Sequence, residues 1–117
     1  MTLASLAAGA ANACGSRAHR STKPDATPSR PLDAAAFRAE RRFAELAVGK
    51  IAYLERGSGD AALFLHGAPL NGFQWRGAIE RLSPHRRCVA PDFMGLGYSE
   101  VPEHQSLAAD AQLAMLV

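Results

Sequence analysis

The sequence predicts an α/β fold over residues 35–117, preceded by a disordered tail over residues 1–34. Three observations predict this division. The segments after residue 42 are typical of strand, strand, strand, helix, strand and helix, which is a hairpin followed by a βαβ unit. The third strand is a continuous apolar run, as in sheets that are covered on both faces. Seven of the eight aromatic residues also lie in residues 43–117, so a hydrophobic core is expected there.

The first 31 residues differ in composition from the rest of the chain. They hold no aromatic residue, and their large apolar side chains are Met1, Leu3 and Leu6. Such a segment buries too little surface to offset the entropy of ordering, so a disordered tail is the first interpretation. Three targeting alternatives stay open: a secretory signal over residues 3–14, a lipoprotein signal at Cys14, and an organelle transit peptide.

The charge distribution argues against a nucleic-acid partner. Residues 1–42 carry seven basic and three acidic residues, whereas residues 43–117 carry six basic and eight acidic residues. A nucleic-acid surface places its positive charge on the folded part, which is slightly acidic here. No run reaches the ~18–20 apolar residues of a membrane span, so no membrane partner is predicted. Cys14 and Cys88 form no zinc or disulfide pattern, and a cytoplasmic location is the default expectation.

The first predicted elements are a hairpin and a buried strand. Residues 43–48 and 51–56 have strand-like composition, and Gly49-Lys50 between them predicts a turn. A second turn is expected over residues 57–60, and the continuous apolar strand over residues 61–65. The sheet is therefore expected to start near residue 43.

A helix, a strand and a second helix are expected next. The helix covers residues 74–82, because apolar side chains recur there on one face. These side chains are Trp75, Ile79 and Leu82. Residues 87–90 have the composition of a fourth strand, and Ser106 is expected to cap a last helix that includes Met115.

Three sequence landmarks occur in order, each on its expected element. The letters HGAP follow the apolar strand at residues 66–69, WR lies in the helix at residues 75–76, and PDFMGLGYS follows the next strand at residues 91–99. With these landmarks, about 75 residues resemble the N-terminal part of the α/β-hydrolase fold family. The resemblance is strongest to the branch that contains haloalkane dehalogenases and epoxide hydrolases. It implies a hydrolase acting on a small-molecule substrate, with no cofactor and no metal.

The loop of residues 66–69 carries the chemistry that this resemblance implies. A substrate carbonyl develops negative charge on its oxygen in the transition state, and fixed backbone N–H groups stabilise that charge. In the family, one such donor is the amide after His-Gly, here Ala68. Gly67 lacks a Cβ and permits close approach, Pro69 fixes the turn, and a cis Ala68–Pro69 bond is implied. The catalytic candidates are the Ala68 N–H and Gly67, and the alternative is an ordinary turn after a strand.

The residue after His-Gly also bears on the substrate. Haloalkane dehalogenases have Asn at the position of Ala68, where its amide helps to hold the halide, and epoxide hydrolases usually have an aromatic residue. Ala68 offers neither group, which counts against both reactions. One wall of an active-site cleft is expected to comprise Ala68, Leu70, Asn71 and Phe73.

His66 and Asp92 are expected to have structural roles. In the family the catalytic histidine follows the nucleophile and the acid, whereas His66 precedes them all. Asp92 is expected to tie its loop together through backbone N–H groups, with Gly95 and Gly97 supplying unusual backbone angles. Ser99 is not expected to be the nucleophile, because no second glycine follows it.

The family's nucleophile, acid and catalytic histidine are not found in these residues. The family places the nucleophile after a fifth strand, and the sequence is expected to stop in the helix before it. The predicted fold is therefore the N-terminal half of a hydrolase sheet, truncated before the nucleophile strand and inactive alone. The open apolar edge of residues 61–65 favours an alternative, a non-enzymatic module stabilised by self-association or a partner. A third hypothesis is a protein that binds nucleic acid or anionic membranes through the basic residues 1–42.

Overall fold

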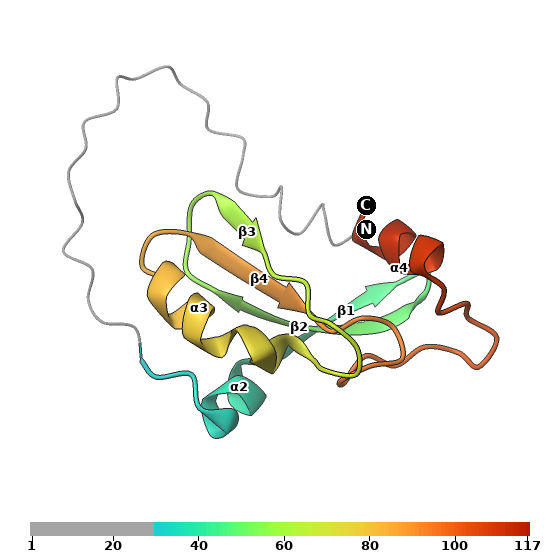
Figure 1. Ribbon diagram of the computed structural model, residues 1–117, viewed down its shortest axis with the longest axis horizontal. Coiled ribbons are helices and arrows are strands. Elements are labelled where there is room, and N and C mark those ends of the chain that lie inside the picture. Colours follow the sequence, from blue (N-terminus) through green and yellow to red (C-terminus); the bar gives the residue numbers. More distant parts are fainter. Residues whose placement is uncertain (1–29) are drawn as a thin grey trace, which may run out of the picture.

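A mixed four-stranded sheet forms the centre of the computed structural model, which describes residues 30–117 (Figure 1). The strands are β1 (Arg42–Leu46), β2 (Gly49–Arg56), β3 (Ala61–Leu63) and β4 (Arg87–Pro91), and they lie in the order β1-β2-β4-β3. The β1–β2 and β2–β4 pairs are antiparallel, and the β3–β4 pair is parallel. The predicted α/β class, with a hairpin followed by a βαβ unit, is confirmed.

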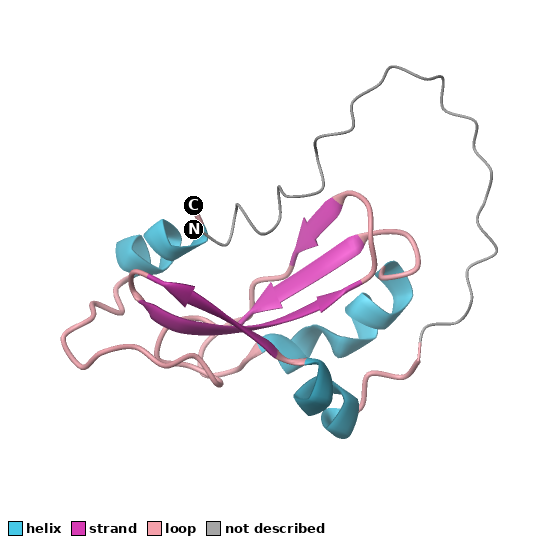
Figure 2. Cartoon of the chain, turned by 180° about the vertical axis from the view of Figure 1, so that it is seen from behind, coloured by secondary structure: helices cyan, strands magenta, loops and turns pink. Residues whose placement is uncertain are grey.

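Helices cover the two faces of the sheet unequally. The helices are α2 (Ala34–Glu40), the 3₁₀ turn η1 (Gly72–Trp75), α3 (Arg76–Leu82) and α4 (Ala109–Leu116). Figure 2 shows α2 and α3 together on one face, and α4 on the opposite side near the β1–β2 turn. In the part of the chain that the structure describes, no helix is long and apolar enough to cross a membrane.

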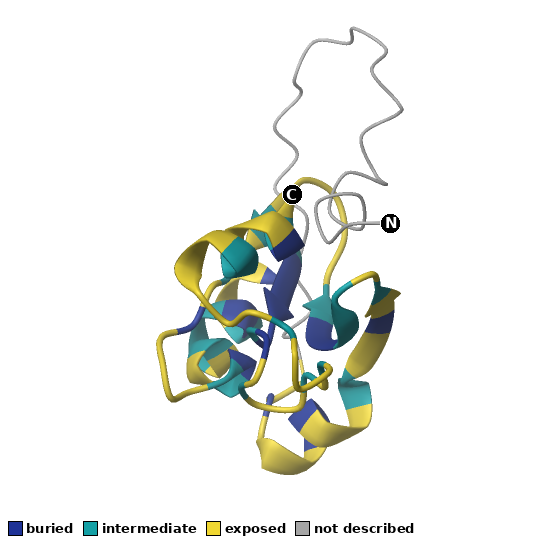
Figure 3. Ribbon diagram, turned by 90° about the vertical axis from the view of Figure 1, so that its right-hand side faces the viewer, coloured by how far each residue is buried: buried dark blue, intermediate teal, exposed yellow. Residues whose placement is uncertain are grey.

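The core follows the alternation of side chains along β2 and β4. Leu54 packs with Cys88, Phe37 of α2 and Ile79 of α3 on one side of the sheet. On the other side, Tyr53 packs with Val89 and Ala44, and Ile51 packs with Met94 and Met115 of α4. The buried residues therefore gather along the central strands (Figure 3).

The hairpin turn lies two residues earlier than predicted. Leu46 pairs with Gly49, so residues 47–48 form the turn and Gly49 already belongs to β2. Gly49 has a φ of +135°, and a Cβ there would lie 2.5 Å from the Glu100 carbonyl oxygen. Lys50 and Glu100 exchange two backbone hydrogen bonds of 2.8 Å. Glycine is needed here for the approach of a distant segment rather than for the turn.

The strand predicted over residues 61–65 is shorter than expected and is covered on one face only. Its last residues, Leu63 and Leu65, are 44% and 40% exposed, because β3 is the edge strand and pairs only with β4. The Phe64 ring faces α3 and lies 5.8 Å from the Trp75 ring. The expectation of a strand buried on both faces is therefore wrong for the part of the chain that is described.

Two helix predictions need correction. The first turn of the predicted 74–82 helix is the 3₁₀ turn η1, and Leu82 is exposed whereas Ile79 is fully buried. Ser106 does not cap α4, because its hydroxyl accepts the Ala108 N–H at 3.3 Å and Ala108 itself holds the N-cap position. A serine hydroxyl that bonds an amide two residues ahead favours a local turn over a helix start.

Helix α2 lies in residues for which no helix was predicted. Asp33 caps this helix, since its Oδ1 accepts the Ala36 N–H at 2.8 Å. Leu32 before the cap and Phe37 after it are both buried in the same cluster, as in a hydrophobic staple. Leu32 is thus packed although it was assigned to the tail. The domain division near residue 35 stays a prediction, and the targeting alternatives for residues 1–29 lie outside the described residues.

Candidate functional site

The loop of residues 66–69 leaves the carboxyl end of β3 and is fixed at both sides of Gly67. The Gly67 carbonyl accepts the Leu70 N–H at 2.8 Å, and the Gly67 N–H donates to the Gln74 Oε1 at 3.3 Å. The Ala68–Pro69 peptide bond is cis, as the resemblance implied. A Cβ at Gly67 would meet no atom within 4 Å, so the space above this residue is open.

The Ala68 amide differs from its neighbours in the loop. Ala68 is exposed, and within residues 30–117 its N–H donates no hydrogen bond. The bonds around Gly67 hold the adjacent peptide in place. A fixed N–H group without an acceptor is the feature that stabilisation of an oxyanion requires.

His66 is buried at 4% exposure, and both of its ring nitrogens are engaged. Nε2 accepts the Phe93 N–H at 3.0 Å, so Nδ1 carries the proton and donates it to the Gly67 carbonyl at 3.0 Å. The imidazole also packs on the Phe93 ring at 4.9 Å. His66 therefore joins its own loop to the loop of residues 92–99, and neither nitrogen is free to move a substrate proton.

Asp92 joins the same two parts of the structure. It is 2% exposed; its Oδ1 accepts the Gly72 N–H at 2.8 Å, and its Oδ2 accepts the Tyr98 N–H at 2.9 Å. The Ser99 hydroxyl donates to the Asp92 carbonyl at 2.7 Å and accepts the Ala52 N–H at 3.0 Å. The side chains of Asp92 and Ser99 thus hold the backbone of neighbouring segments in place.

Two glycines in the 92–99 loop have left-handed backbone conformations. Gly95 has a φ of +75°, and a Cβ there would lie 2.8 Å from the Leu107 side chain. Gly97 has a φ of +55°, and a Cβ there would overlap the Asp92 carboxylate. The carboxylate reaches the Tyr98 N–H because residue 97 has no side chain.

The three residues expected to line a cleft beside Ala68 lie in different surroundings. Leu70 is exposed, whereas the Asn71 Oδ1 accepts the Phe73 N–H at 3.0 Å and caps η1. The Phe73 ring packs edge-on against Phe37 of α2 at 5.2 Å. The structure therefore brings Ala68 and Leu70 to the surface of one loop and turns Phe73 toward α2.

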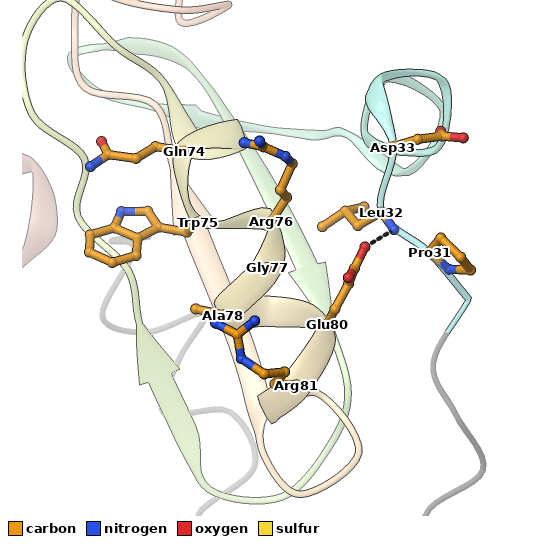
Figure 4. A pocket seen from close by; sticks show the side chains of 10 residues that line it. All are labelled: Pro31, Leu32, Asp33, Gln74, Trp75, Arg76, Gly77, Ala78, Glu80 and Arg81. Carbon is orange, nitrogen blue, oxygen red and sulfur yellow. Dashed lines mark hydrogen bonds between the residues drawn. The ribbon is translucent and has the colours of Figure 1, made fainter.

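A hollow of about 570 Å³ lies between α3 and residues 31–33 (Figure 4). Its walls include Trp75, Arg76 and Arg81, and the Leu32 N–H donates to the Glu80 carboxylate across one end. No residue of the 66–69 loop lines it. Within residues 30–117, no group of three or more His, Cys, Asp or Glu side chains could hold a metal ion.

Sequence reasoning missed two glutamines that hold the loops. Gln74 orients the 66–69 loop, and Gln112 of α4 bonds both the N–H and the carbonyl of Met94 at 3.0 Å. A glutamine on a helix is usually a solvated surface residue, so no sequence pattern points to these contacts.

Known proteins are similar to part of this chain in sequence and in fold. Residues 61–117 match the profile of the alpha/beta hydrolase fold. A haloalkane dehalogenase of Mesorhizobium japonicum is 37% identical over 79 residues, covering 67% of this chain and 25% of that protein. Haloalkane dehalogenase 2 of Mycobacterium bovis is 41% identical over 63 residues, covering 54% and 22%. The chain thus spans about a quarter of the length of these relatives.

Solved structures agree with the sequence relatives. A mutant haloalkane dehalogenase DatA from Agrobacterium tumefaciens C58 superposes with a TM-score of 0.56 at 32% identity, covering 62% of this chain and 25% of that one. The epoxide hydrolase CorEH superposes with a TM-score of 0.51 at 35% identity, covering 53% and 22%.

The fold and its two linked loops therefore define part of an α/β-hydrolase fold. Residues 61–117 match the α/β-hydrolase fold family, and the chain is similar to haloalkane dehalogenases over part of its length. The resemblance inferred from the three landmarks is confirmed.

Proposed function

We propose that these residues form the oxyanion-binding part of a hydrolase that acts on a small-molecule substrate. The observation that carries this proposal is the exposed Ala68 N–H, which has no acceptor within residues 30–117, in a loop fixed by the bonds of His66 and Gly67. The nucleophile, the acid and the catalytic histidine then come from sequence outside these 117 residues. Alone, the 117 residues are catalytically inactive.

The residue at position 68 narrows the substrate class. The named relatives are haloalkane dehalogenases and an epoxide hydrolase. An alanine side chain has no N–H to hold a leaving halide, whereas the backbone N–H of Ala68 suits an oxygen that gains negative charge. We therefore expect esters or related carbonyl compounds to be better substrates than haloalkanes.

A chimera tests the role of the Ala68 amide. The matched residues of this chain replace those of the Mesorhizobium japonicum relative, which supplies the remaining sequence. Replacing the Ala68 amide by an ester linkage removes the N–H and also weakens the Gly67 carbonyl as an acceptor, and we expect ester hydrolysis to fall about 10²–10³-fold. The same replacement at the exposed Glu103 is the control and leaves the rate unchanged. An equal rate in both variants contradicts the proposal.

The same chimera tests the substrate class. Ala68→Asn is expected to raise the turnover of 1-bromobutane and to lower that of 4-nitrophenyl esters, while Ala47→Asn in the exposed hairpin turn changes neither. The isolated 117-residue chain is expected to hydrolyse neither substrate. Ester hydrolysis by that chain, purified to homogeneity, overturns the inactivity proposal.

A second function is favoured by the exposed edge of β3. Leu63 and Leu65 are exposed there, and within the described residues β3 has a partner strand on one side only. An apolar, unpaired edge can add a strand from another chain. The alternative proposal is a non-enzymatic module that self-associates through this edge. Light scattering of the purified chain is expected to show a discrete oligomer, and a folded monomer contradicts it. We also propose a cytoplasmic location, which cell fractionation tests.

A further inference from the structure

A small cavity of about 120 Å³ lies between α2, η1 and the 92–99 loop. Its lining includes Phe37, Arg38, Arg41, Asn71, Phe73 and Tyr98. Figure 1 shows α2 on the lower side of the sheet, beside the start of α3. The residues that α2 contributes to the lining are three or four positions apart in the sequence, so they lie on one face of the helix. The cavity therefore runs along the side of the helix. None of residues 66–69 lines it, so the cavity is separate from the proposed oxyanion-binding loop.

The Arg41 guanidinium is the main charged group of this cavity. Its central carbon lies 3.3 Å from the centre of the Tyr98 ring and 5.7 Å from that of Phe37, so two aromatic rings hold it in place. The Arg41 Nε is buried and has no hydrogen-bond partner within residues 30–117. No carboxylate of the described residues lies within 4 Å of this guanidinium. A buried donor of this kind is stabilised by any acceptor that enters the cavity.

The other polar groups of the cavity are also donors. Arg38 forms no ion pair with the described residues. The Asn71 oxygen already accepts the Phe73 N–H, so the Asn71 amide has its NH₂ group to offer. No Asp or Glu lines the cavity. The walls therefore combine positive charge with unmet donors.

Helix α2 ends beside this cavity, and its C-terminus acts against an anion there. Carbonyl groups at the end of a helix repel negative charge. The Phe37 carbonyl, however, is occupied by the Arg41 N–H at 3.1 Å.

We propose that this cavity binds a small carboxylate, such as acetate or formate. Its volume of about 120 Å³ exceeds the ~10–15 Å³ that a single water needs, so the cavity has room for a small anion. A carboxylate is planar and matches the fork of a guanidinium, and the flat rings of Phe73 and Tyr98 line the same space.

Binding to the complete chain tests the site. ¹³C-acetate is titrated at constant ionic strength and followed by NMR. We expect saturable binding that Arg41→Lys, which keeps the charge but loses the fork, weakens about tenfold. Arg38→Gln is expected to weaken it severalfold, and the control Arg81→Gln, which lines the larger hollow and not this cavity, leaves it unchanged. Circular dichroism checks the fold of each variant; if Arg41→Lys unfolds, Arg38→Gln decides.

Three results overturn the proposal. One is the lack of saturable acetate binding, which is also the result expected if a carboxylate from outside the described residues already fills the cavity. Another is equal acetate affinity in the wild type, the Arg38 variant and the Arg81 variant. The third is tighter binding of inorganic phosphate than of acetate at the same ionic strength, because that result contradicts the carboxylate assignment.

Discussion

At the scale of single residues, Asp92 does the most to hold the site together. Its two carboxylate oxygens accept N–H groups from Gly72 and Tyr98, and its own backbone binds Ala52 and Ser99. A buried carboxylate is stable only when such donors surround it. Asp92 therefore fixes the positions of η1 and the 92–99 loop relative to β2.

Asp92→Asn is expected to lower the free energy of unfolding by about 3 kcal/mol. An amide keeps one acceptor and turns an NH₂ group toward a backbone N–H, which leaves a buried donor unpaired. Urea denaturation measures the change. The control is Asp60→Asn, an exposed side chain whose replacement is expected to cost less than about 0.5 kcal/mol. Equal costs contradict a structural role for Asp92.

At the scale of elements, the loops after β3 and β4 form one unit, and helices attach to it from both sides. His66 and Asp92 join the loops, Gln74 holds the first loop to η1, and Gln112 holds the second loop to α4. Helix α2 attaches to β2 through the paired side chains of Glu40 and Arg56. Polar contacts position these loops and helices relative to one another, and apolar packing stabilises the arrangement.

Gly97→Ala separates backbone strain from steric overlap. Both Gly97 and Gly59 have positive φ, but a Cβ at Gly59 meets no atom within 4 Å whereas one at Gly97 overlaps Asp92. Gly59→Ala is expected to cost about 1 kcal/mol for the backbone alone, and Gly97→Ala about 2 kcal/mol more because the loop must shift. The two variants are compared by urea denaturation. Similar losses would show that Asp92 is not packed against residue 97.

The ion pair that attaches α2 to β2 gives a pH dependence. The hydrogen bond from Arg56 lowers the pKa of Glu40, and the nearby charges of Arg56 and Arg30 act in the same direction against partial burial. A lowered pKa in the folded state stabilises the protein above the unfolded value of about 4.3, and this stability is lost as the pH falls through the folded value.

Glu40→Gln is accordingly expected to destabilise the chain by up to about 1 kcal/mol at pH 7, because the pair is partly exposed. The difference between wild type and variant is expected to be smaller at pH 3 than at pH 7. Denaturation at both pH values measures it, with the exposed Glu45→Gln as control. A difference that is undiminished at pH 3 rules out the ion pair as its cause.

At the scale of the whole molecule, one face of the sheet is better covered than the other. Helices α2 and α3 pack on the first face, whereas α4 covers the second face around Ile51, near the β1–β2 turn. Leu63 and Leu65 stay exposed at the edge strand. The sheet therefore leaves apolar side chains exposed at its β3 edge.

The double substitution Leu63→Lys and Leu65→Lys is expected to abolish the self-association proposed for this edge, because charge on an edge strand opposes strand addition. Light scattering measures the mass in solution. Leu113→Lys on the exposed side of α4 is the matched control and leaves the mass unchanged. An unchanged oligomer in the double variant places the interface elsewhere.

The sequence by itself determined the strands, their order along the chain and the two loops. Hydrophobic periodicity marks elements that bury one face, and the letters HGAP and PDFMGLGYS mark turns whose backbone needs glycine or proline. Local signals were also present for α2, in the cap Asp33 between Leu32 and Phe37, but they were outweighed by the polar composition of the preceding residues.

The tertiary structure alone decided the features that depend on residues far apart in sequence. The hairpin turn was misplaced because Gly49 serves the approach of Glu100, and the glutamine contacts exist only where helices meet loops. Whether the Arg41 side chain lies next to an acidic residue or in a cavity without one likewise depends on how α2 packs against the rest of the fold. Hydrophobic patterns in the sequence indicate which face of a segment is buried and which is exposed to water. Contacts between distant segments form only when the chain has packed.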